Sequence, residues 1–76
     1  MRSIQARYIS MREKYPEPCS SYICFVRTIR GQKYSYEMIG KWFNILVEKD
    51  NYAQSERNAI VKYLYKLSNT PEEKEF

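Results

Sequence analysis

Apolar residues recur at three- and four-residue spacing along this sequence, and no segment shows the two-residue alternation or the Asn-Gly turn of a β-hairpin. The first predicted helix runs from about residue 3 to residue 14, with an apolar stripe formed by Ile4, Tyr8, Met11 and Tyr15. Pro16 and Pro18 end it, because each proline biases its predecessor away from helical geometry. The pattern predicts an all-α fold, a compact bundle of three to four helices.

Two further helices are predicted on either side of a short turn that contains Gly31. The second helix begins near Ser20 or Ser21, either of which can cap its free amides, and ends at Arg30. Its inward residues are Tyr22, Phe25, Val26 and Ile29. The third helix follows Ser35 as its N-cap, and its buried stripe is Ile39, Trp42, Phe43 and Leu46.

The last helix is predicted after a break at residues 50–52, with Ser55 as its N-cap. Its apolar stripe is Ile60, Tyr63, Leu64 and Leu67. Residues 1–70 then form one helical domain, whose core is built by Phe25, Ile39, Trp42, Phe43 and Leu64. Residues 71–76 form an acidic tail with little to bury, which we expect to be dispensable for folding.

The charge of the chain points to an anionic partner. Its 76 residues carry a net charge of +4, and residues 1–70 hold twelve of the thirteen basic and six of the nine acidic residues. A basic body favours nucleic acid ahead of an acidic protein or a membrane surface. The alternative, that these charges only keep the protein in solution, stays open.

The composition also excludes several kinds of chemistry. The chain has no histidine and only two cysteines, so we expect no metal site, no cofactor and no enzymatic activity. Cys19 and Cys24 lie five positions apart, which points them to different sides of the second helix and disfavours a disulfide. No apolar run approaches the ~20 residues of a membrane span. A cytoplasmic location with reduced thiols is predicted.

Two predicted helices joined by a short glycine-containing turn are the arrangement of a helix-turn-helix unit. After the capping serine, Ile39 and Lys41 are followed by Leu46-Val47-Glu48-Lys49. In this respect residues 35–52 resemble the second helix and exit of winged-helix regulators of the MarR type, and the resemblance covers roughly residues 20–52. The resemblance implies DNA binding, with residues 35–47 as the recognition helix.

Two groups of side chains are candidates for contacts with nucleic acid. On the third helix, Lys41 is suited to guanine or phosphate and Asn44 to adenine. Glu37 lies four residues before Lys41, however, and such a pair is the ordinary signature of a solvated face, which is the favoured interpretation of this stripe. Around the turn, three cations and two phenols suit phosphate contacts or base stacking: Arg27, Arg30, Lys33, Tyr34 and Tyr36. Helix-end charge matching by the two arginines is the alternative.

The eight tyrosines divide into two groups. Tyr8, Tyr22 and Tyr63 lie on apolar stripes and are expected in the core, whereas Tyr34, Tyr36 and Tyr65 are better suited to an interface. The sequence thus predicts a small basic nucleic-acid-binding protein without enzymatic activity. DNA is favoured and RNA is possible, as a DNA-binding regulator or an accessory subunit of a nucleoprotein complex. The alternative is a protein–protein interaction module, an adaptor or inhibitor of a larger complex. The oligomeric state stays open.

Overall fold

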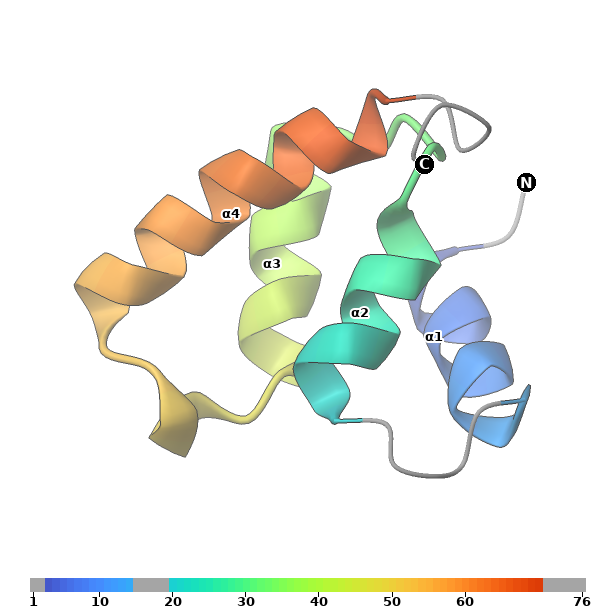
Figure 1. The fold of residues 1–76 in the computed structure, drawn as a ribbon, viewed down its shortest axis with the longest axis horizontal. Coiled ribbons are helices and arrows are strands. Elements are labelled where there is room, and N and C mark those ends of the chain that lie inside the picture. Colours follow the sequence, from blue (N-terminus) through green and yellow to red (C-terminus); the bar gives the residue numbers. More distant parts are fainter. Residues whose placement is uncertain (1–2, 15–19, 71–76) are drawn as a thin grey trace.

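The computed structural model describes residues 3–14 and 20–70, and these residues form four α-helices, one short 3₁₀ helix and no strand (Figure 1). In chain order the elements are α1 (Ile4–Lys14), α2 (Ser21–Ile29), α3 (Tyr36–Leu46), η1 (Lys49–Asn51) and α4 (Gln54–Ser68). The predicted all-α fold is therefore confirmed. The predicted acidic tail and the proline segment before α2 lie outside the described residues.

Side-chain caps begin α2 and α3 as the sequence predicts. The Ser20 hydroxyl accepts a hydrogen bond from the Ile23 amide at 3.2 Å, and the Ser35 hydroxyl accepts one from the Met38 amide at 3.2 Å. Gly31 follows the end of α2 with a φ of 72°, a conformation that glycine adopts without a steric penalty.

The predicted N-cap of the last helix was wrong. Helix α4 begins at Gln54, after Ala53, so Ser55 lies inside its first turn. Ala53 has no polar side chain, and the carboxylate of Glu56 instead accepts a hydrogen bond from the Ala53 amide at 2.9 Å. The acceptor at this helix start therefore comes from the third helical residue, as in one half of a capping box.

The core is formed by side chains from all four α-helices. Phe25 and Phe43 lie at its centre, with their rings edge to face at 5.6 Å, and Ile39 and Leu64 are also fully buried. These four residues confirm the predicted core. Trp42 is a correction, because it is only partly buried.

The position of Trp42 follows from the line of burial along α3. This line runs through Ile39, Phe43 and Val47, which are four residues apart. Trp42 lies beside that line, and the Lys41 ammonium is 5.5 Å from the centroid of its ring. Its indole therefore covers the edge of the core and does not fill the centre.

The helices pack in two pairs, α1 against α2 and α3 against α4, and α2 also contacts α3 and α4 (Figure 1). The C-terminal ends of α2 and α4 meet, because the Gly31 amide donates to the Leu67 carbonyl at 3.2 Å. The following turn is fixed by the buried Ser68. Its carbonyl accepts from the Lys33 amide and its hydroxyl from the Tyr34 amide, both at 2.8 Å.

The opposite end is held together by Arg57, which is 2% exposed. Its guanidinium donates to the Val47 carbonyl at 2.9 Å and to the Asn44 side-chain oxygen at 3.2 Å, and it lies 4.9 Å from the centroid of the Phe43 ring. These groups belong to the C-terminal end of α3, where free carbonyls carry partial negative charge. The start of α4 is thereby joined to the end of α3.

Cys24 is fully buried and disulfide-bonded, so the expectation of a reduced thiol was wrong at this position. Helical spacing disfavours a disulfide only if both cysteines belong to one helix. Helix α2 begins only at Ser21, so the helical spacing does not apply to the pair. Cys19 lies outside the described residues.

Candidate nucleic-acid interface

Five cations gather at the end of the molecule where α2 and α4 meet. Lys66 lies in the last turn of α4, Lys33 lies in the turn that is bonded to Ser68, and Arg7 donates to the Thr28 carbonyl of α2 at 3.1 Å. Arg27 lies in the last turn of α2, and Arg30 follows that helix directly. We call this set, Arg7, Arg27, Arg30, Lys33 and Lys66, the basic end.

Acidic side chains gather at the other end. Glu48, Asp50 and Glu56 belong to the segment between α3 and α4 and to the first turn of α4, and all three are exposed. The Glu48 amide donates to the hydroxyl of Ser21 at the start of α2, at 3.3 Å, so this end lies opposite the basic end. Glu37, in the first turn of α3, is an acidic exception near the basic end. This end also carries the cations Lys49 and Arg57, whereas the five cations of the basic end have only Glu37 near them among these acidic residues.

Arg7 takes the structural role that the sequence suggested for the arginines of α2. Its bond to the Thr28 carbonyl places a cation at the C-terminal end of α2, where the helix dipole favours positive charge. Arg7 is not among the predicted site residues, because in the sequence it is equally plausible as a solvated position of the first helix. Only the packing of α1 on α2 brings it to this end.

The two tyrosines predicted around the turn lie in different environments. Tyr34 is 5% exposed and belongs to the core, where burial raises the pKa of its phenol and Arg7 lowers it in part. Tyr36 is 41% exposed and its ring meets that of Tyr65 edge to face at 5.6 Å. The exposed pair Tyr36–Tyr65 is therefore the aromatic surface beside the basic end, and the ring of Tyr34 lies inside.

The exposed face of α3 carries fewer basic residues than is typical of a recognition helix that binds in a DNA groove. Lys41 is exposed, but the side-chain oxygen of Asn44 accepts the bond from Arg57. Met38 and Ile45 are 38% and 58% exposed on the same helix. Of the seven predicted site residues, four thus lie at or beside the basic end, Lys41 lies further along α3, and Tyr34 and Asn44 are engaged in the fold.

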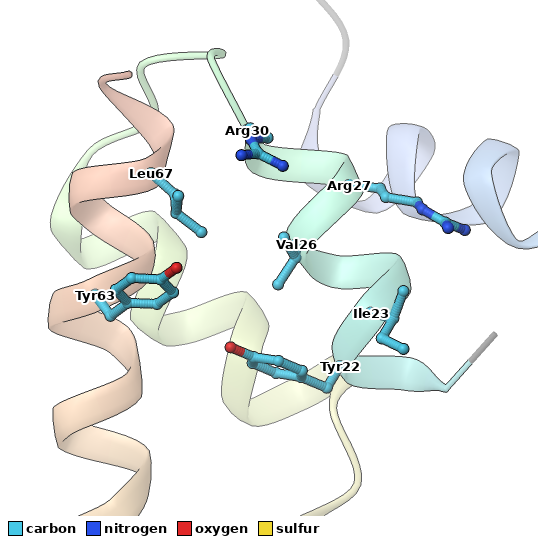
Figure 2. Close-up of a pocket in the computed structure, with 7 residues that line it drawn as sticks. All are labelled: Tyr22, Ile23, Val26, Arg27, Arg30, Tyr63 and Leu67. Carbon is cyan, nitrogen blue, oxygen red and sulfur yellow. The ribbon is translucent and has the colours of Figure 1, made fainter. Parts of the chain in front are cut away.

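A groove between α2 and α4, with a volume of about 340 Å³, was not predicted from the sequence (Figure 2). Tyr22 from α2 and Tyr63 from α4 point into it from its two sides, and it is also lined by Ile23, Val26, Arg27, Arg30 and Leu67. Tyr22 and Tyr63 were both expected in the core. Tyr63 is instead 55% exposed, because Val61 and Leu64 form the buried line of α4.

The phenol of Tyr22 is affected by this environment. Burial raises its pKa above the usual value, and the neighbouring Tyr63 and Tyr52 raise it further. Its ring lies 6.2 Å from that of Tyr52. The raised pKa keeps the hydroxyl protonated, and therefore a hydrogen-bond donor, to a higher pH than is usual for tyrosine.

In residues 3–14 and 20–70, no three Cys, Asp or Glu side chains lie close enough together to bind a metal ion. Among the same residues, every helix is too short or too polar to span a bilayer. Comparison of the chain with protein-family models, curated proteins and solved structures finds no match. The winged-helix resemblance of residues 20–52 therefore stays a prediction, and the segment that follows them forms the helix α4.

Proposed function

We propose that this protein binds nucleic acid without enzymatic activity and contacts phosphates through its basic end. The observation that carries the proposal is the gathering of five cations at one end of the molecule. Arg27, Lys33 and Lys66 share one end with Arg7 and Arg30, whereas Glu48, Asp50 and Glu56 lie at the other. A one-sided set of cations attracts and orients a phosphate backbone.

The groups beside the basic end fit the same partner. The N-terminal end of α3 lies next to Lys33, and free amides at a helix N-terminus favour a phosphate oxygen. Tyr36 and Tyr65 add an exposed aromatic surface on which an unpaired base can stack. Phosphate contacts fix orientation without reading sequence, so the proposed role is that of a regulator or an accessory subunit of a nucleoprotein complex.

The test is a binding titration against duplex DNA, single-stranded DNA and structured RNA at two salt concentrations. For duplex DNA we expect affinity to fall with salt by a log–log slope of roughly 0.9 per neutralised phosphate. The double variant Lys33→Asn/Lys66→Gln should lower that slope by roughly 2. Asparagine is chosen because Lys33 has a φ of 59°, which asparagine tolerates well.

A matched control removes the same charge elsewhere. Lys14 ends α1 and Lys49 lies in η1, so Lys14→Gln/Lys49→Gln lowers the net charge equally and leaves the basic end intact. Its salt slope should equal that of the parent. Equal losses in both double variants would show that total charge, and not the basic end, governs binding.

A second candidate function, a protein–protein contact, is favoured by the apolar stripe on α3. Met38, Trp42 and Ile45 lie four and three residues apart, and all three are at least partly exposed. Ile45→Lys separates the two functions, because Ile45 lies on the exposed stripe of α3 and outside the basic end. Nucleic-acid binding through the basic end should not weaken, whereas a protein contact through the stripe is lost.

A further inference from the structure

The groove between α2 and α4 has the chemistry of a peptide-binding site. Val26 and Leu67 give it an apolar floor, and the rings of Tyr22 and Tyr63 enter from its two sides (Figure 2). Arg30 lies at the end where the two helices meet, and Arg27 extends from α2 on the side away from α4. Such a site suits a short segment with one large apolar side chain and acidic residues beside it.

We propose that this groove is the docking site of the chain's own residues 71–76, the sequence Pro-Glu-Glu-Lys-Glu-Phe. This segment carries three carboxylates and one aromatic ring, which match the arginines and the apolar floor in kind. The groove itself belongs to a body of net charge +6, so an acidic occupant is favoured over a second copy of the basic body.

The position of the segment along the chain supports this occupant. Leu67 lines the groove, and α4 ends one residue later at Ser68. The Thr70 amide donates to the Leu67 carbonyl at 3.1 Å, so the chain leaves the helix axis immediately before Pro71. The segment therefore starts at the Arg30 end of the groove.

The length of the segment is sufficient to follow the groove. Six extended residues span up to about 20 Å. The eight residues from Arg30 back to Tyr22 in α2 rise about 12 Å. Glu72 and Glu73 then pass Arg30, and Phe76 reaches the space between the two tyrosine rings.

Docking in this groove shields part of the basic end. Arg27 and Arg30 line the groove and also belong to the set that we propose for phosphate contacts. This consequence rests on the proposed function, and the docking itself does not. The segment acts as a competitor for an anionic partner, and salt weakens both interactions.

The direct test is nuclear Overhauser spectroscopy on the isotope-labelled full chain. Cross-peaks are expected from the ring of Phe76 to the methyl groups of Val26 and Leu67, and their intensities should not change with protein concentration. Phe76→Ala should shift the amides of the groove residues and leave those of Met38 and Ile45 on α3 in place. Absence of the cross-peaks in the parent chain would overturn the proposal, as would a concentration dependence that assigns the segment to a second copy.

Charge variants test whether the carboxylates of the segment contribute to its docking. The triple variant Glu72→Gln/Glu73→Gln/Glu75→Gln keeps Phe76, and its cross-peaks should weaken severalfold at low salt. Cross-peaks of full strength in this variant would show that the carboxylates do not contribute. As a separate readout, Phe76→Ala should tighten binding of a short duplex DNA at low salt. Cross-peaks with no DNA binding would refute the proposed function and leave the docking intact.

Discussion

Arg57 is a buried cation whose described partners are helix-end groups, with no carboxylate among them. Its guanidinium donates to Val47 and Asn44, and its face covers the ring of Phe43. Burying a charge costs several kcal/mol unless hydrogen bonds replace the lost water. The carbonyls at the end of α3 supply these bonds, and in return the guanidinium satisfies groups that would otherwise be buried without a donor.

Replacing Arg57 with lysine keeps the charge and removes the fork of donors. A single ammonium cannot reach Val47 and Asn44 in the geometry of a planar guanidinium, so we expect Arg57→Lys to cost about 2–4 kcal/mol. Urea denaturation measures this loss. Lys62→Arg, at an exposed position of the same helix, should stay within about 0.5 kcal/mol. An Arg57→Lys variant as stable as the parent would show that charge alone holds the two helices together.

The two adjacent aromatic residues of α3 should differ in their effect on stability. Phe43 is fully buried, so Phe43→Ala should cost about 3–5 kcal/mol, enough to unfold much of so small a domain. Trp42 covers only the edge of the core, so Trp42→Ala should cost about 1–2 kcal/mol and leave the chain folded. Thermal melts followed by circular dichroism give both values. The reverse order would place the centre of the core at the indole.

The missed residues show what periodicity predicts and what it omits. Arg57, Val61, Leu64 and Ser68 are buried at spacings of four, three and four, so the two polar members continue the apolar line of α4. The spacing of Arg57 and Ser68 could be read from the sequence. Because their side chains are polar, they were not assigned to the buried stripe of α4. Whether a polar group at such a position is buried depends on a partner from elsewhere in the chain, which periodicity does not identify.

The turn between α2 and α3 is an element whose conformation is set by α4. The fully buried hydroxyl of Ser68 accepts a hydrogen bond from the Tyr34 amide, and the Ser68 carbonyl accepts one from the Lys33 amide. The sequence located this turn correctly from Gly31 and Ser35. It did not indicate that Tyr34 points inward, because the partner of its amide lies 34 residues away.

Ser68→Ala should destabilise the protein by about 1–3 kcal/mol, because it leaves the buried Tyr34 amide without an acceptor. Hydrogen exchange of the Tyr34 amide should speed up more than that of the Phe25 amide. Ser55→Ala is the matched control, since Ser55 is exposed in the first turn of α4 and does not cap it. A loss from Ser55→Ala as large as that from Ser68→Ala would contradict this assignment of roles.

The raised pKa values of two tyrosines predict how the stability of the protein changes at high pH. Burial raises the pKa of Tyr22 in α2 and of Tyr34 in the turn above the usual value of about 10. The folded state therefore keeps these protons while the unfolded state loses them. The contribution of these two phenols to the free energy of unfolding is fully present below about pH 10. It is lost as the pH rises through their pKa values in the folded state. Urea midpoints at pH 9, 10 and 11 should fall less steeply in Tyr22→Phe than in the parent, with Tyr36→Phe as the exposed control. Parallel curves for the two variants would contradict the prediction.

At the scale of the whole molecule, the charges and the apolar surfaces are arranged separately. The basic end lies where α2, α4 and the turn meet, Glu48, Asp50 and Glu56 lie around η1 and the start of α4, and the apolar stripe of α3 runs between the two ends. Net charge could be read from the sequence. The positions of the charges in space could not be predicted, because they depend on how the helices pack. Packing puts the C-terminal ends of α2 and α4 together and brings Arg7 of α1 to the same end.

This gathering of cations predicts that a small multivalent anion stabilises the folded protein. Pyrophosphate binds the folded basic end and finds no such cluster in the unfolded chain, so at about five times its Kd it should add about 1 kcal/mol. For a domain of this size that is a rise in Tm of roughly 4–8 °C over sodium chloride at equal ionic strength. Thermal melts at a few millimolar pyrophosphate measure it. The rise should be at least halved in Lys33→Asn/Lys66→Gln and unchanged in Lys14→Gln/Lys49→Gln. Equal rises in the two double variants would mean that the anion acts through the net charge, and the basic end would then not be a binding site.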